Sequence, residues 1–137
     1  MKMKKNNGIG KRFLVFLVFS MFLVVSCELL SSPSAKTAQE FVQKYSQAYR
    51  NGNAGLIVKM TELGRGQTED SFKDDIKKDI QAKSFGYLAW SNTRYVSEQD
   101  HGDYIRVNVE ISGAQSSIVL VKREGLLKLA LNPSNFE

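Results

Sequence analysis

Cysteine and histidine are scarce in this 137-residue chain, and their scarcity excludes several kinds of protein. Cys27 is the only cysteine and His101 the only histidine. A single thiol cannot form an intramolecular disulfide, so an exported domain must rely on its own hydrophobic core. His101 lies in a predicted polar turn at residues 98–103, where we expect a solvated side chain. No carboxylate cluster has the spacing of a metal site, and we expect neither a metal nor a cofactor.

Acidic residues are absent from the first 27 residues, whereas five basic residues lie in the first 12. An apolar run from Phe13 to Val25 follows, interrupted only by Ser20. This order is typical of a secretory signal, and the run is shorter than the roughly 20 residues that a membrane-spanning helix needs. The rest of the chain has 14 basic and 14 acidic residues. The net charge of +5 therefore reflects the N-terminal segment and does not indicate nucleic-acid binding.

The end of the apolar run, Val24-Val25-Ser26-Cys27, resembles a bacterial lipobox. The resemblance implies cleavage between Ser26 and Cys27, a signal peptide at residues 1–26, and a lipid on the Cys27 thiol that anchors the protein to a membrane. It also implies the bacterial cell envelope. The outer membrane is favoured where one exists, because Glu28 is not the aspartate of an inner-membrane retention signal; otherwise we expect the outer face of the cytoplasmic membrane. Three alternatives stay open: an ordinary signal peptide with a buried or incidental thiol, an uncut single-pass anchor, and a cytosolic protein with an apolar N-terminus.

Three helices are predicted in the first part of a single domain at residues 37–132, which follows a tether at 27–36 and precedes a polar tail at 133–137. Thr37 caps a helix at 38–50, Asn53 caps one at 54–60, and Thr68 opens a third. Residues 61–67 are expected to form a loop. Its Gly64-Arg65-Gly66 segment lacks the spacing and the Lys-Ser/Thr of a phosphate-binding loop.

Alternation with a period of two predicts four strands in the second part of the domain, at 85–96, 104–111, 116–122 and 126–131. In the second of these, Ile105, Val107 and Val109 share one face. Helices that precede a series of strands indicate an α+β domain, with about three helices packed on one face of a curved four-stranded antiparallel sheet.

Two segments resemble a known fold family. Residues 38–53, AQEFVQKYSQAYRNGN, are similar to the leading helix of cystatin-like or nuclear transport factor 2-like domains of the lumazine-binding-like kind. Residues 118–131, IVLVKREGLLKLAL, are similar to the final hairpin of that family, with Leu127 where tryptophan is common. The resemblance implies a cone-shaped domain with a pocket at its open end, in a family that includes both enzymes and binding modules.

Aromatic residues and arginines are the candidate contacts for a ligand or a partner: Tyr45, Tyr49, Trp90, Arg94, Tyr95, Tyr104 and Arg106. Large aromatic side chains with a few polar groups are typical of ligand pockets. The alternative is that the aromatic residues belong to the core and the arginines to a solvated sheet face. We find no pattern typical of a catalytic residue.

We therefore expect a non-enzymatic, lipid-anchored envelope protein whose domain binds a partner protein, a glycan or a small ligand. Two alternatives stay open. One is a hydrolase-like or isomerase-like enzyme that uses carboxylates or tyrosines in a pocket. The other is an inhibitor or immunity-type protein that inserts the loop at residues 61–67 into its partner.

Overall fold

A computed structural model describes residues 32–132, and from Pro33 on these residues belong to one compact unit. The predicted signal peptide, the Ser26–Cys27 cleavage site, most of the tether and the polar tail lie outside the described residues. Within residues 32–132, no helix is long and apolar enough to cross a membrane.

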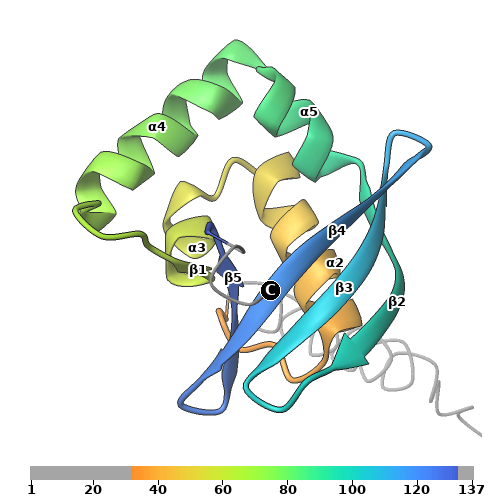
Figure 1. Cartoon of the computed structure of the whole chain (residues 1–137). Helices are drawn as coiled ribbons and strands as arrows, with labels where there is room; N and C mark the ends of the chain where they lie inside the picture. The colour runs from red at the N-terminus through yellow and green to blue at the C-terminus, as the bar shows by residue number, and fades with distance from the viewer. Residues whose placement is uncertain (1–31, 133–137) are drawn as a thin grey trace, which may run out of the picture. The chain divides into compact units, whose positions relative to one another are not determined.

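Four helices and five strands make up the described unit, and Figure 1 shows them in chain order. The helices are α2 (Ala38–Arg50), α3 (Ala54–Lys59), α4 (Glu69–Ala82) and α5 (Phe85–Ser91). The strands are β1 (Thr61–Glu62), β2 (Thr93–Asp100), β3 (Tyr104–Ile111), β4 (Ala114–Arg123) and β5 (Leu126–Ala130). They form one sheet in the order β1-β5-β4-β3-β2.

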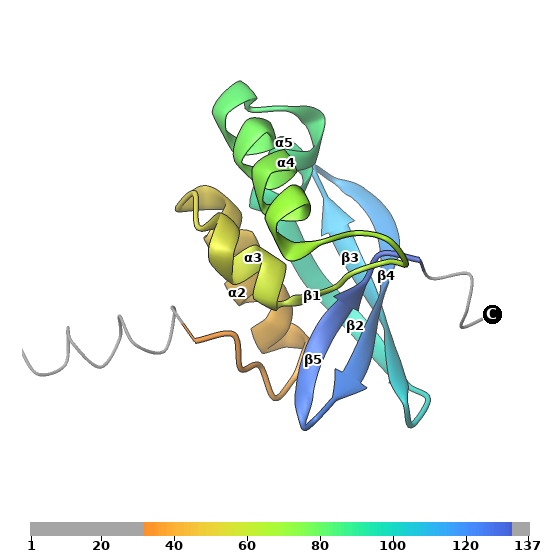
Figure 2. The same ribbon diagram turned by 90° about the vertical axis from the view of Figure 1, so that its left-hand side faces the viewer.

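The α+β class is confirmed, with helices packed against one face of the sheet (Figure 2). The first three predicted helix starts are correct because their caps form as the sequence indicates. The side-chain oxygens of Thr37, Asn53 and Thr68 accept backbone N–H groups of Glu40, Leu56 and Ser71 at 3.0–3.2 Å. The β3 prediction is also correct, and its alternate residues Ile105, Val107 and Val109 are buried.

The predicted strand at residues 85–96 is wrong in its first half, because Phe85–Ser91 forms the helix α5. Three side chains at the C-terminal end of this helix donate to carbonyl groups four residues earlier: Ser91 to Tyr87, Asn92 to Leu88 and Thr93 to Ala89. The segment is rich in aromatic residues, which favour strands, but tertiary contacts override such preferences. The strand begins at Thr93 and continues to Asp100.

The predicted four-stranded antiparallel sheet is also wrong, since the sheet has five strands and is mixed. The additional strand β1 lies in the expected loop and pairs in parallel with β5, Thr61 opposite Leu129 and Glu62 opposite Ala130. A two-residue strand is too short to show a hydrophobic period, so the sequence carried no signal for it.

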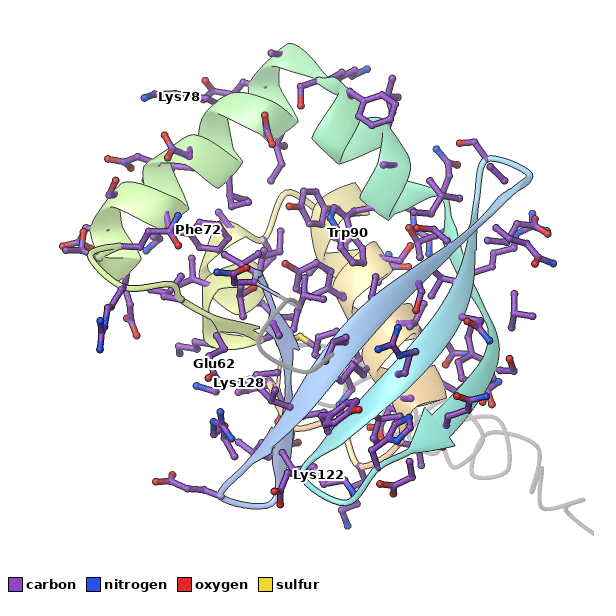
Figure 3. All side chains as sticks on the ribbon, in the orientation of Figure 1. Glu62, Phe72, Lys78, Trp90, Lys122 and Lys128 are labelled. Carbon is purple, nitrogen blue, oxygen red and sulfur yellow. The ribbon has the colours of Figure 1, made fainter. Side chains whose placement is uncertain are left out.

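The core lies between α2, α3 and the sheet. Its largest fully buried side chains include Phe41, Tyr45, Ile57 and Met60 from the helical side and Leu120 from β4. Half-buried Phe72 and Trp90 pack against this core from α4 and α5, and Figure 3 shows both directed inward while Lys78 points away. Tyr45 therefore stands at the centre of the domain.

Candidate functional site

A cavity of about 760 Å³ lies between α2 and the first residues of β2, and we call it the α2–β2 groove. Such a volume is within the range of ligand pockets in proteins. One wall comes from α2, with Gln39, Val42, Gln43, Ser46 and Arg50. The other comes from residues 91–95, and Glu110 of β3 completes the lining together with Ser112 and Gly113 of the β3–β4 turn.

The helical wall presents one stripe of polar side chains, because its residues recur at steps of three or four. The middle of the stripe is fixed: the Ser46 hydroxyl donates to the Ser91 carbonyl at 3.2 Å, and an Arg50 Nη donates to the Ser46 Oγ at 3.2 Å. Arg50 has further guanidinium N–H groups beyond this bond. The helical wall therefore has a hydrogen-bonded serine at its middle and a cationic group at the C-terminal end of α2.

The strand wall combines fixed and unpaired groups. The Thr93 hydroxyl donates to the Ala89 carbonyl at 2.8 Å, and the Tyr95 hydroxyl donates to Glu98 Oε2 at 3.2 Å. Partial burial and the Glu98 carboxylate raise the pKa of Tyr95 above its ordinary value of 10.0, so its hydroxyl, like that of an ordinary tyrosine, is neutral at physiological pH. Arg94 and Glu110 are opposite each other in the β2–β3 register, yet among residues 32–132 neither forms an ion pair.

Of the predicted contact residues, the structure brings Arg94 and Tyr95 into the groove. Tyr45, Tyr49 and Trp90 instead form a cluster in the core, with the Tyr45 and Trp90 ring centroids 4.6 Å apart. The Tyr45 hydroxyl donates to Thr61 Oγ1 at 2.9 Å, since Thr61 itself donates to the Ile57 carbonyl. These three aromatic side chains do not line the groove.

Burial controls the ionisation of the core tyrosines. Desolvation raises the pKa of Tyr45 far above its ordinary value, and desolvation together with the charge of Asp79 raises the pKa of Tyr49 to about 12. Both hydroxyls are therefore neutral across the physiological range.

The other two predicted residues lie on β3, away from the groove. Tyr104 stacks on His101 at the β2–β3 turn, with ring centroids 4.6 Å apart, and Arg106 is opposite Gln99 in the register. His101 is exposed, as expected for a turn residue. Within the described part of the chain, no group of three or more histidine, cysteine, aspartate or glutamate side chains could hold a metal ion.

The sequence analysis missed the helical wall of the groove. Gln39, Gln43 and Arg50 are not among the candidate contacts predicted from the sequence, because a polar stripe on an amphipathic helix usually contacts water. Their spacing was visible in the sequence. Their position beside the edge of the sheet was not, because it depends on where β2 begins.

A second polar site surrounds Glu62, which lines two smaller cavities of about 480 and 450 Å³ (Figure 3). Glu62 Oε1 accepts from an Arg123 Nη at 2.8 Å, and Glu62 Oε2 is buried with no hydrogen-bond partner among residues 32–132. The paired Arg123 is a surface residue, so this ion pair is worth little in stability. The α2–β2 groove is larger than either of these cavities.

No protein-family model matches the chain, and no curated protein matches it.. Among solved structures, it is similar to a crystal structure named "Putative NTF2-like transpeptidase" from Campylobacter jejuni, at 12% sequence identity and a TM-score of 0.45. The similarity covers 64% of this chain and 92% of that chain. At this level it carries no argument about the activity of this chain.

Proposed function

We propose that this protein is a lipid-anchored cell-envelope protein whose nuclear transport factor 2-like domain binds a ligand or a partner in the α2–β2 groove, without catalysis. The groove is the observation that carries the proposal. The lining groups that have no partner in the described part of the chain are amides, a guanidinium and a carboxylate, which are suited to hydrogen bonding and charge recognition. Its fixed serine and threonine hydroxyls are bonded to backbone carbonyls, which supports a role in shaping the groove.

The contacts of the segment that enters the domain support the proposal that a lipid on Cys27 holds the domain close to a membrane. Ala35 is fully buried, the Lys44 ammonium donates to the Ser34 carbonyl, and the Lys36 backbone N–H donates to Glu40 Oε2 at 2.9 Å. Residues 34–36 are thus fastened to α2. A lipid on Cys27 would then be separated from Ser34 by six residues, a reach of at most about 25 Å.

The groove starts close to this entry point. Gln39 is its first helical residue and lies in the first turn of α2, immediately after the fastened segment. A short tether and a groove that begins near its attachment favour a ligand that belongs to the envelope. A soluble ligand would not require such closeness to the membrane.

The variant Cys27→Ser tests the anchor. We expect the wild-type protein to incorporate a labelled fatty acid and to sediment with membranes, whereas Cys27→Ser remains unlabelled and is released. Ser31→Ala serves as a matched control, since it changes a small residue of the same tether and leaves the thiol in place. If Cys27→Ser sediments with membranes to the same extent as wild type, lipid anchoring through Cys27 is wrong.

A further inference from the structure

The strand wall of the α2–β2 groove is an edge of the sheet. β2 is the last strand in the order β1-β5-β4-β3-β2, so among the described elements it has β3 on one side and no strand on the other. A strand edge presents unpaired backbone N–H and C=O groups and can receive an additional strand. The straight part of this edge is short, because a register shift between Tyr95 and Ser97 interrupts it at Val96.

The register shows which backbone groups face the open edge. Ile111 and Ala114 flank the two-residue turn between β3 and β4, so they form a hydrogen-bonded pair and Ile111 points its backbone groups at β4. Backbone groups alternate along a strand, so those of Glu110 point at β2, where Arg94 is its partner. Thr93 and Tyr95, on either side of Arg94, must then direct their N–H and C=O groups away from β3, toward the groove.

Opposite these groups stands a helix. The α2 stripe from Gln39 to Arg50 runs along the other wall, so the groove is a slot between a helix and an open strand. Extended peptides bind to sheet edges through main-chain hydrogen bonds, and the neighbouring side chains provide specificity. Here Arg50 and Arg94 outnumber Glu110 among the charged lining residues, which favours a ligand with a carboxylate.

We propose that the α2–β2 groove binds an extended peptide segment of a partner protein as an additional strand on β2, and that the segment has an acidic side chain or a C-terminal carboxylate. This inference rests on the proposed binding function and specifies its ligand. The Thr93 and Tyr95 backbone groups bind the peptide main chain. The Arg50 guanidinium binds its carboxylate, and the exposed Arg94 adds positive charge at the same strand edge.

Amide hydrogen exchange, followed by nuclear magnetic resonance on the full-length protein in detergent micelles, tests the edge itself. In the free protein, the amides of Thr93 and Tyr95 exchange fast while the Arg94 amide between them is protected. A captured peptide, selected from a phage-displayed library of short random peptides, then protects Thr93 and Tyr95. Enrichment of carboxylate-rich sequences supports the proposal, whereas no enrichment, or enrichment without protection of these amides, overturns it.

Two variants of one residue isolate the backbone donor. Tyr95→Pro removes the outward N–H, which an edge strand tolerates because that N–H is not part of the ladder, and Tyr95→Val removes the ring but keeps the N–H. We expect Tyr95→Pro to bind the captured peptide about tenfold more weakly than Tyr95→Val. Equal affinities overturn strand addition. If Tyr95→Pro fails to fold, a peptide with N-methylated backbone amides replaces it and must bind more weakly than its unmethylated form.

Failure of this inference is distinguishable from failure of the proposed function. A groove that captures an anionic oligosaccharide from a glycan array, with chemical-shift changes at Arg50 and Arg94 but no protection of Thr93 and Tyr95, overturns the peptide ligand and retains a binding function. The anchor is tested separately, because peptide capture by the purified protein does not depend on Cys27.

Discussion

At the scale of single residues, the ion pair of Glu40 and Lys44 fastens the segment through which the chain enters the domain. Lys44 is 6% exposed, unusually buried for a lysine, and its ammonium lies 3.0 Å from Glu40 Oε1. The Lys36 backbone N–H and the Lys44 side chain bond to the Glu40 carboxylate, and both lower the pKa of Glu40. Glu40 and Lys44 thereby hold residues 34–36, which lead into α2.

The variant Glu40→Gln tests this fastening. A lowered pKa in the folded state stabilises the protein above the ordinary value of 4.5, and this contribution is lost as the pH falls through the folded-state pKa. Glu40→Gln should therefore reduce the free energy of unfolding by about 1–2 kcal/mol at neutral pH and by much less near pH 3. Urea unfolding at both pH values measures this.

Asp74→Asn is the matched control, because Asp74 forms an exposed i,i+3 pair with Lys77 on α4. Surface pairs of this kind contribute roughly 0–1 kcal/mol, so we expect little change at either pH. A loss in Glu40→Gln that is no larger than in Asp74→Asn, or that is independent of pH, would show that Glu40 does not fasten the entry segment.

At the scale of secondary structure, α5 determines where β2 starts and hence where the groove lies. Its outward residues are Phe85, which is 86% exposed, and Leu88, which is 49% exposed, whereas Trp90 packs on Tyr45 and Tyr49. In a strand, Leu88 and Trp90 would share one face because side chains alternate with a period of two. In the helix they lie on different faces. Substitutions at Leu88 and Trp90 can therefore distinguish a helix from a strand at residues 85–91.

Trp90→Ala should therefore destabilise the protein by about 2–4 kcal/mol, since it leaves a cavity beside two buried rings. Leu88→Ala, on the solvent side, should change the free energy of unfolding by less than about 0.5 kcal/mol. Chemical denaturation of the two variants decides between helix and strand. Comparable losses in both would contradict the helix at residues 85–91.

Local signals explain which elements could be predicted from the sequence. Three helices could be predicted from their N-cap residues Thr37, Asn53 and Thr68, because each cap bonds within the first turn of its own helix. The strand β3 could be predicted because its buried and more exposed residues alternate along the sequence. The helix α5 and the strand β1 depend on distant partners, Tyr45 for Trp90 and Leu129 for Thr61. No local pattern encodes such contacts.

The candidate site likewise has residues that could be predicted from the sequence and residues that could not. Arg94 and Tyr95 could be selected as exposed arginine and aromatic side chains on a predicted strand, and the structure places both in the groove. Tyr45 and Tyr49 have the same residue types but are 1% and 3% exposed. Residue type alone could not separate the groove from the core, because the separation depends on which face of α2 meets the sheet.

At the scale of the whole molecule, the groove and the entry segment lie on one helix. α2 provides the stripe from Gln39 to Arg50 on one face and holds residues 34–36 through Glu40 and Lys44. Together with a lipid on Cys27, this arrangement supports our proposal that an anchored domain binds an envelope partner in the α2–β2 groove.

Site-specific photo-crosslinking in intact cells tests this statement most directly. A photoreactive residue is introduced at Gln43, an exposed position in the groove, and at Lys78, an exposed position on α4 that is remote from the groove. We predict one discrete adduct with an envelope protein at Gln43, none at Lys78, and loss of the Gln43 adduct in the Cys27→Ser background. Absence of an adduct at Gln43, or the same adduct at both positions, would contradict the account.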